Sequence, residues 1–279
     1  MNGILLPPLN IPALLRRYDL RPSRGLGQNF LQENATLQKI VSAAELGPVD
    51  DVLEIGPGLG SLTRYLALSA RSVTAVELDR KLFPALESVL APYKNVRLVQ
   101  GDILKLDPAQ LMKTPGYIVV ANIPYYITSM VIRHLLEAEQ RPSRVVLTVQ
   151  KEVAERICAV PGKMSLLALS VQVYGKPAIG LTLPAEAFYP APKVDSAVLT
   201  IEVYLQPNLP TDRLDLFFKL IKAGFSQKRK TLRNAISGGL RIAPVEAEEM
   251  LSAAGIDPRR RAETLSLEEW GNLVQEFKT

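Results

Sequence analysis

Residues 51–60, DVLEIGPGLG, decide the fold of this chain. The first five form a short, mainly apolar run typical of a buried strand, and glycines follow at positions 56, 58 and 60. Glycines at such a point let the chain turn sharply and let the backbone approach a ligand. Residues 61–68 then have helical character, so we expect a strand, a tight turn and a helix. The G-x-G-x-G spacing differs from the dinucleotide fingerprint, and such turns also serve plain strand-to-helix packing.

The same alternation of apolar runs and helical segments continues along the chain. Apolar runs covered on both faces are typical of parallel strands, so the fold class is α/β, with a doubly wound, mostly parallel sheet of seven strands. The last two strands have no helix-length segment between them, so we expect that pair to be antiparallel. The apolar residues within 165–174 fit both the helical and the strand period, and the length of the segment favours a helix. The expected strands are residues 51–55, 73–76, 96–99, 117–121, 145–149, 178–183 and 196–204, with helices at 80–90 and 129–139.

The pattern changes from strands to helices near Pro207 and Pro210, which mark a linker. We therefore divide the chain into a leader (1–24), a Rossmann-like domain (25–206) and a small all-helical C-terminal domain (207–279). The last helix begins with Ser266 and Glu269, the spacing of a capping box. The expected C-terminal helices are residues 213–225, 228–237, 245–254 and 267–277.

Composition excludes several classes of function. With one cysteine and one histidine among 279 residues, the chain can form neither an internal disulfide nor a Cys/His zinc cluster, and we expect no metal. The lone Cys158 and His134 fit packing positions on helices. No apolar stretch approaches the ~20 residues that span a bilayer. We expect a cytoplasmic monomer without a membrane anchor.

Acidic residues end two of the expected strands. Glu77 lies about 20 residues after the glycine turn, where a carboxylate can accept both hydroxyls of a ribose. Asp102 ends the next strand and can reach the exocyclic amine of an adenine. Because the carboxyl ends of parallel strands share one edge of a sheet, the glycines, Glu77 and Asp102 together predict an adenosine site. Each acidic residue alone also fits a helix cap.

Asn122-Ile123-Pro124-Tyr125 follows the fourth strand and opens onto the same edge. The Asn122 and Ile123 carbonyls can accept the two protons of a planar amine, which favours the pyramidal nitrogen of a methyl-transfer transition state. Pro124 restrains the turn, and Tyr125 offers a face on which an extruded base can stack. Phe188 fits a second stacking face or core packing. Taken alone, the tetrapeptide also occurs as an ordinary strand-ending turn.

These motifs, in this order, closely resemble the KsgA (RsmA) family of ribosomal RNA adenine dimethyltransferases. Besides those quoted above, they include residues 27–31 (GQNFL), 77–79 (ELD) and 188–198 (FYPAPKVDSAV). The resemblance runs from about residue 25 to the C-terminus. It implies a Rossmann-like methyltransferase fold, S-adenosylmethionine as cofactor and dimethylation of two adjacent adenosines near the 3′ end of 16S rRNA. It also implies a role in assembly of the small ribosomal subunit.

The resemblance assigns roles to individual residues. It places Asn29 and Leu31 at the mouth of the cofactor site, Gly56 at the methionine end, Glu77 at the ribose and Asp102 at the adenine. Asn122 would touch both cofactor and substrate. The cofactor-binding residues we expect are Asn29, Leu31, Gly56, Gly58, Glu77, Asp102, Ile103 and Asn122, and the catalytic residues are Asn122, Ile123, Pro124, Tyr125 and Phe188.

A basic segment in the C-terminal domain indicates a polyanionic partner. Residues 222–241 carry six basic residues and no acidic one, in a chain of net charge +5. Arg229 and Arg233 lie four apart on the expected helix, and a solvated charged face is the alternative. The expected RNA-binding residues are Lys228, Arg229, Lys230 and Arg233.

Other functions fit parts of the sequence. The rivals are a large-subunit rRNA methyltransferase of the macrolide-resistance type, a methyltransferase for protein or small-molecule amines, and an assembly or transcription factor without turnover. Residues 188–198 and 228–234 favour the KsgA type over the first, and the basic helical segment disfavours the second. The complete 122–125 motif and Glu77 argue against loss of activity. An NAD-binding protein fits least, because the glycine spacing is wrong.

Overall fold

The computed structural model describes residues 6–277, so residues 1–5 of the expected leader and residues 278–279 of the expected C-terminal domain lie outside it. Contacts divide the chain into two compact units. The sheet unit comprises residues up to Ala154 and Ala178–Val203, and the helical unit comprises Glu155–Pro177 and the chain from Tyr204 onward. Residues 155–177, which we assigned to the first domain, thus group with the helices. The functional boundaries at 24/25 and 206/207 stay predictions.

A seven-stranded sheet forms the centre of the sheet unit, in the order β4-β3-β2-β5-β6-β9-β7. The first five strands in this order, from β4 through β3, β2 and β5 to β6, are parallel, and β9 runs antiparallel to β6. The expected seven-stranded, mostly parallel sheet is therefore confirmed. Its strands are β2 (Asp51–Ile55), β3 (Ser72–Glu77), β4 (Val96–Gln100), β5 (Ile118–Asn122), β6 (Arg144–Gln150), β7 (Gly175–Leu183) and β9 (Ser196–Val203).

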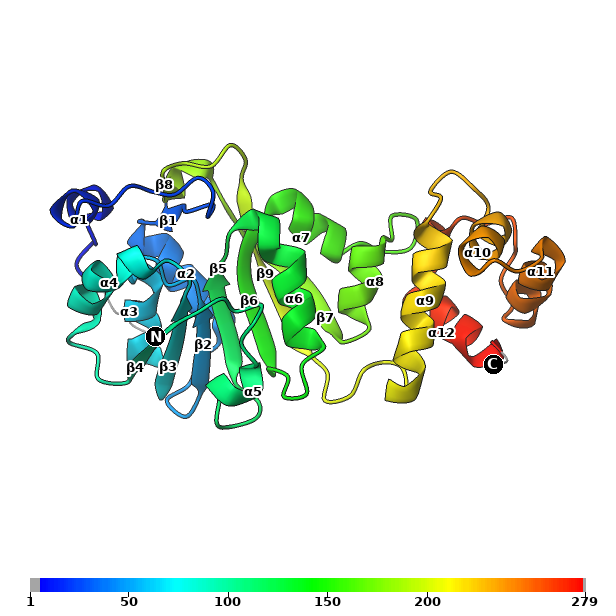
Figure 1. Cartoon of the computed structure of the whole chain (residues 1–279), viewed down its shortest axis with the longest axis horizontal. Helices are drawn as coiled ribbons and strands as arrows, with labels where there is room; N and C mark the ends of the chain where they lie inside the picture. The colour runs from blue at the N-terminus through cyan, green and yellow to red at the C-terminus, as the bar shows by residue number, and fades with distance from the viewer. Residues whose placement is uncertain (1–5, 278–279) are drawn as a thin grey trace. The chain divides into compact units, whose positions relative to one another are not determined.

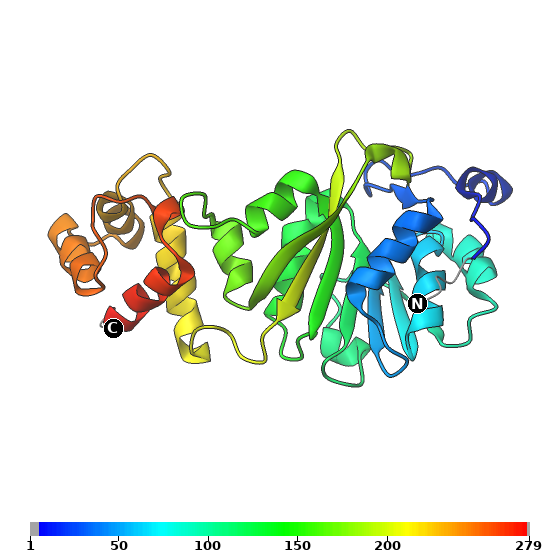
Figure 2. The ribbon, with the colours of Figure 1, turned by 180° about the vertical axis from the view of Figure 1, so that it is seen from behind.

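Helices cover both faces of the sheet, which explains the nearly continuous apolar strands. One face is seen in Figure 1, behind α6, and the other in Figure 2, behind α2. Leu37 and Ile40 of α2 and Leu66 of α3 are buried in one cluster with strand residues Val52 and Val120. The helices of this unit are α1 (Ile11–Arg17), α2 (Asn34–Ala44), α3 (Ser61–Ser69), α4 (Phe83–Leu90), α5 (Pro108–Leu111) and α6 (Thr128–Leu136), with α7 (Lys151–Ile157) at its end.

The N-terminal part holds elements that the sequence patterns did not reveal. Residues 11–17 form α1, and the side chain of Asn10 accepts a hydrogen bond from the Ala13 amide at 3.0 Å. A proline in the first helical turn is well tolerated because it lacks only an amide that has no helical partner there. Two short strands, β1 (Phe30–Leu31) and β8 (Phe188–Tyr189), pair antiparallel and join this region to the loop before β9.

The helical unit packs around a buried tryptophan. Trp270, Phe217 and Leu232 are fully buried, and the expected capping box of Ser266 and Glu269 is present. Residues 165–174 contain a helix, as their length favoured. The helices are α8 (Leu166–Gln172), α9 (Leu214–Phe225), α10 (Leu232–Leu240), α11 (Pro244–Ala253) and α12 (Leu267–Glu276). None of the helices between residues 6 and 277 combines the length and the apolar character that a bilayer crossing needs.

Helix α10 begins later than expected. It starts at Leu232 and not at Lys228, so Arg229 lies in a turn and not one helical turn before Arg233. The amides of Leu232 and Arg233 donate to the carbonyls of Arg260 at 2.7 Å and Pro258 at 3.1 Å. These first-turn amides have no partner inside the helix, so the loop around residue 260 fixes where the helix begins.

Two adjacent glycines on α10 should respond to alanine in opposite ways. A Cβ at Gly239 would lie 2.6 Å from Cα of Ala223 on α9, whereas one at Gly238 would meet only the flexible amide of Gln227 at 3.1 Å. We expect Gly239→Ala to lower the free energy of unfolding by about 1–3 kcal/mol through overpacking. Gly238→Ala should raise it by about 0.5–1 kcal/mol, because alanine favours the helix. Urea denaturation measures both, and equal effects at the two positions would contradict this packing.

Candidate active site

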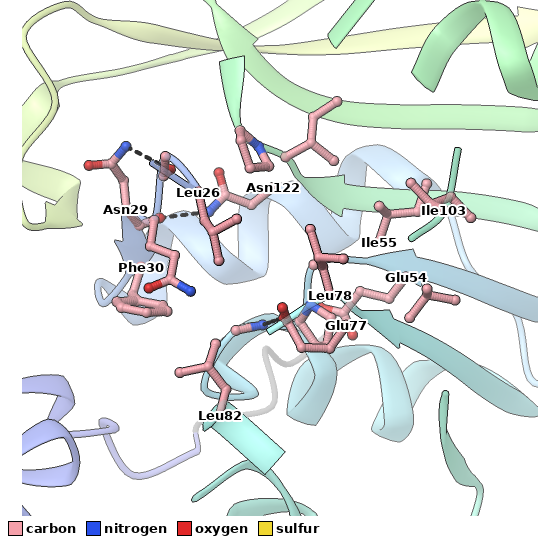
Figure 3. Close-up of a pocket in the computed structure, with 18 of the residues that line it drawn as sticks. Leu26, Asn29, Phe30, Glu54, Ile55, Glu77, Leu78, Leu82, Ile103 and Asn122 are labelled. Atoms are coloured by element: carbon pink, nitrogen blue, oxygen red, sulfur yellow. Dashed lines mark hydrogen bonds between the residues drawn. The ribbon is translucent and has the colours of Figure 1, made fainter. Parts of the chain in front are cut away.

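A pocket opens at the carboxyl edge of the parallel strands, where open α/β sheets bind ligands. It encloses about 1020 Å³ of space, a volume that includes the open solvent at its mouth. Figure 3 shows lining side chains from strands β2, β3 and β5 and from the segment before β1. Eleven of the twelve expected cofactor-binding and catalytic residues line it: Asn29, Leu31, Gly56, Gly58, Glu77, Asp102, Ile103, Asn122, Ile123, Pro124 and Tyr125.

The glycine turn forms one wall of the pocket. Gly56, Gly58 and Gly60 have φ angles of 68°, 60° and 84°, in the left-handed region that favours glycine. At Gly58 space adds to this constraint, because a Cβ there would lie 2.9 Å from the ring of Phe30. The sharp turn that the sequence predicted is therefore present, and it exposes backbone to the pocket at Gly56 and Gly58.

Glu77 is fixed at the end of β3 by two backbone amides. Its Oε2 accepts a hydrogen bond from Gly58 N–H at 3.1 Å, and its Oε1 accepts one from Asp79 N–H at 2.8 Å. The residue is 6% exposed, and burial raises the pKa of the carboxyl group, while these amides act against the rise. The carboxylate thus links the glycine turn to β3 and lines the pocket in a fixed position.

Asp102 and Ile103 lie at the end of the neighbouring strand. Asp102 Oδ1 accepts a hydrogen bond from Leu104 N–H at 3.1 Å, so part of this carboxylate caps the local turn, the alternative noted for acidic strand ends. Its side chain nevertheless lines the pocket, and Ile103 is 4% exposed beside it. A planar apolar ring bound here would meet Ile103 and a carboxylate together.

A hydrogen bond joins Asn122 to a segment 93 residues away in the sequence. Asn122 Nδ2 donates to the backbone carbonyl of Asn29 at 3.0 Å (Figure 3). Asn29 in turn donates from Nδ2 to the carbonyl of Gly27 at 3.2 Å. This bond engages one of the two amide protons of Asn122 and sets the orientation of the amide, whose oxygen is an acceptor at the pocket. An amine is one of the hydrogen-bond donors that this acceptor can bind.

Tyr125 is held through its hydroxyl group. The hydroxyl lies 2.6 Å from Ser196 Oγ at the start of β9. Burial raises the pKa of Tyr125, and the hydrogen bond with Ser196 acts against this rise. The ring is partly exposed and lines the pocket, so it stands as a fixed wall against which a flat group can stack.

A family model described as ribosomal RNA adenine dimethylase matches residues 21–279. The chain belongs to this family. The resemblance drawn from the sequence motifs is thus confirmed, and so is the fold class.

Relatives in this family match nearly the whole chain. The chain is 48% identical to ribosomal RNA small subunit methyltransferase A of Dehalococcoides mccartyi strain CBDB1, covering 95% of this chain and 91% of that protein. It is 47% identical to the protein of that name in Moorella thermoacetica, over 98% of both chains.

Two solved structures are similar across both units of the chain. A dimethyladenosine transferase from Plasmodium falciparum matches with a TM-score of 0.75 and 27% identity over 89% of this chain and 97% of that one. The 23S rRNA methyltransferase ErmE matches with a TM-score of 0.73 and 30% identity over 89% and 99%.

Among the expected cofactor-binding and catalytic residues, Phe188 is the one that does not line the pocket. It is 2% exposed in the apolar core of the sheet unit, and its strand β8 pairs it with Leu31. The packing alternative therefore describes Phe188, because a ring enclosed by core residues has no face left for a base. Sequence reasoning instead missed Tyr126, which lines the pocket and is 59% exposed. The pattern could not tell which of two adjacent tyrosines faces outward.

Glu54 is a second pocket residue to which sequence reasoning gave no role. It is 1% exposed, lines the pocket, and its Oε2 has no hydrogen-bond partner among the described residues. Burial raises its pKa to about 8, Thr63 partly offsets this, and the Glu77 carboxylate adds to the rise. A buried carboxyl oxygen without a partner beside the glycine turn fits a polar ligand group, as a nucleoside and amino-acid cofactor would supply.

The expected RNA-binding residues lie in the helical unit and differ among themselves. Lys228, Arg229 and Lys230 are exposed in the turn between α9 and α10. Arg233 instead pairs with Glu248 of α11, with Nη1 2.9 Å from Oε2. The local sequence carries no acidic residue, but the fold supplies one, so Arg233 is less available to phosphate than its three neighbours.

The raised pKa of Glu54 gives a prediction for stability. Below its ordinary pKa of 4.5 the side chain is protonated in both folded and unfolded chains, and between 4.5 and about 8 only the folded chain keeps the proton. Stability should therefore fall as pH rises through this window. We expect Glu54→Gln to flatten that decline, as measured by urea denaturation between about pH 5 and about pH 8. The exposed Glu87→Gln is the control, and parallel curves for parent and Glu54→Gln would contradict the assignment.

Proposed function

We propose that this chain transfers methyl groups from S-adenosylmethionine to the exocyclic amines of two adjacent adenosines near the 3′ end of 16S rRNA, within the assembling small ribosomal subunit. The observation that carries the proposal is the orientation of the Asn122 side-chain amide. Its nitrogen is bound to the Asn29 carbonyl, and its oxygen remains for an amine in the pocket that holds the glycine turn and Glu77. Family membership supports the reaction, and the curated relatives support the small subunit.

The residues that would hold the cofactor form one continuous wall. We assign the ribose hydroxyls to Glu77, the adenine edge to Asp102 and Ile103, and the methionine end to Gly56 and Gly58. Asn29 and Leu31 close the mouth. When bound there, S-adenosylmethionine supplies an electrophilic methyl group on its sulfonium. The left-handed glycines and the unpartnered buried oxygen of Glu54 are the features of this chain that fit such a group.

The residues around Asn122 orient the substrate amine. An adenine amine is a weak nucleophile, because its lone pair is delocalised into the ring. If Asn122 Oδ1 and the Ile123 carbonyl accept its two protons, they favour the pyramidal nitrogen of the transition state and direct its lone pair at the methyl group. The nitrogen gains the methyl group and later loses a proton to water, so no strong base is needed.

The Tyr125 ring can stabilise an adenine that is flipped out of the RNA base stack. Tyr125 offers a ring fixed through Ser196, and stacking on such a ring is worth roughly 1–3 kcal/mol per base. A flipped adenine held between this ring and the Asn122 carbonyl would meet the cofactor edge of the pocket. Once methylated, the amine has one proton left, and rotation about the C–N bond can present that proton to Asn122.

Binding of the polyanionic substrate is assigned to the exposed basic turn of the helical unit. Lys228, Arg229 and Lys230 can each neutralise a phosphate, and Arg233 can do so on releasing Glu248. These assignments and the expected monomeric state are part of the proposal.

Methyl transfer to ribosomal subunits tests the proposed function. The chain is incubated with methyl-labelled S-adenosylmethionine and small subunits from cells that lack this modification, beside naked 16S rRNA and large subunits. We expect label in dimethyladenosine after digestion of the small subunits, and none from subunits that are already dimethylated. Label in large subunits alone would assign the chain to the rival substrate of the ErmE type. Absence of label throughout would contradict a methyltransferase function.

A further inference from the structure

The segment before β1 carries exposed arginines a few residues ahead of the stretch from Leu26 to Leu31 that lines the pocket. Arg21 and Arg24 are exposed, and neither side chain forms an ion pair or hydrogen bond within the part of the chain that the structure describes. Arg16 and Arg17 are also exposed, at the end of α1. Asp19 is the acidic residue of this stretch. These cations are separate from the basic turn of the helical unit.

This segment is a built part of the sheet unit. Ile11 and Leu15 of α1 are buried in a cluster with Phe30, Leu59 and Leu82, the last three of which line the pocket. The Arg64 side chain, 6% exposed, donates to the Pro7 carbonyl at 2.8 Å. Both ribbon views place α1 beside α4 at the end of the sheet where β1 and β8 lie (Figures 1 and 2). The described part of the leader thus packs behind the pocket wall.

The loop that carries Arg24 is closed and anchored. Ser23 N–H donates to Gln28 Oε1 at 2.7 Å, Gln28 N–H donates to the Ser23 carbonyl at 3.1 Å, and Gly27 N–H donates to the Arg24 carbonyl at 3.1 Å. Gln28 also donates from Nε2 to Asp79 Oδ2 at 2.9 Å. Gly27 and Gln28 line the pocket, so these bonds fix the backbone of Arg24 next to the pocket-lining part of the loop.

An exposed aromatic ring lies against the same loop. Tyr126 is 59% exposed and lines the pocket, and a Cβ placed on Gly27 would lie 3.4 Å from Tyr126 Cε1. Gly27 thus contacts the Tyr126 ring on one side and the backbone carbonyl of Arg24 on the other. A cationic group beside an exposed ring is the combination by which proteins bind single-stranded nucleic acid, the cation on phosphate and the ring on a base.

We propose that Arg21, Arg24 and Tyr126 form a binding surface for the RNA strand that flanks the target adenosine, and call it the mouth surface. The two guanidinium groups bind backbone phosphates, and the Tyr126 ring stacks on the base next to the one that enters the pocket. Guanidinium groups suit phosphate because they donate in a planar, bidentate fork. This inference rests on the proposed function, and it assigns RNA contacts to the sheet unit in addition to those of the helical unit.

The salt dependence of RNA binding tests the arginines. Unmethylated small subunits and protein-free 16S rRNA are titrated with the parent chain and with the Arg21→Gln/Arg24→Gln variant over a range of KCl at fixed magnesium. Loss of two phosphate contacts should reduce the slope of log affinity against log salt by about 1.4, at about 0.7 per contact on a single strand. The control, Lys94→Gln/Lys113→Gln, removes two exposed cations that precede β4 and β5 at the opposite edge of the sheet and should leave the slope unchanged.

Substitution of Tyr126 tests the stacking contact. We expect Tyr126→Ala to weaken RNA binding roughly tenfold without changing the salt slope, and Tyr126→Phe to retain parental affinity because the ring is kept. Calorimetric titration with S-adenosylmethionine should give the parental dissociation constant for each variant, which shows that the pocket itself is intact.

The outcomes separate this surface from the function on which it rests. A parent chain that binds neither probe overturns both proposals. If the parent chain binds RNA and the arginine variant shows the same salt slope as the parent, only the proposal of the mouth surface is overturned. Weaker binding of the variants to intact subunits but not to protein-free rRNA also overturns it, because the surface would then bind ribosomal protein.

Discussion

The hydrogen bond from Asn122 to the carbonyl of Asn29 is the interaction on which the rest of the site depends. It ties the end of β5 to the segment before β1, and so joins the strand that carries the proposed amine acceptor to the segment proposed to cover the cofactor. It also decides chemistry, because it fixes which atom of the Asn122 amide is free. Glu77 makes the matching link on the other side, from β3 to the glycine turn.

Hydrogen bonds of this kind hold several polar groups of the pocket in fixed positions. Backbone amides hold the Glu77 carboxylate, a serine holds the Tyr125 hydroxyl, and a backbone carbonyl holds the Asn122 nitrogen. Methyl transfer to a weak nucleophile depends on positioning, so such fixed groups can contribute by holding the reactants in place. Glu54 adds a buried acid whose raised pKa keeps it neutral near pH 7, which limits repulsion with Glu77.

Much of this architecture follows from the sequence because it depends on local patterns. Apolar runs with helices between them give the parallel sheet, and its geometry brings Gly56, Glu77, Asp102 and Asn122 to one edge. Long-range packing decided the rest. The two-residue strands β1 and β8 have no period to detect, and their pairing buries Phe188. Arg233 pairs with a glutamate 15 residues away, and a loop carbonyl sets the start of its helix, which no local pattern records.

Single-turnover methyl transfer by Asn122→Asp, measured as a function of pH, most directly tests whether the Asn122 side chain must donate to the Asn29 carbonyl and accept from the amine at the same time. A carboxylate cannot donate to the Asn29 carbonyl, whereas a protonated carboxyl group restores one donor and one acceptor. Relative to the parent chain, the variant should therefore be nearly inactive at about pH 8 and gain activity as pH falls toward about 5.5, while Asn122→Ala stays inactive throughout. Parental activity of Asn122→Asp at the higher pH, or a ratio to the parent that does not change with pH, would contradict the account.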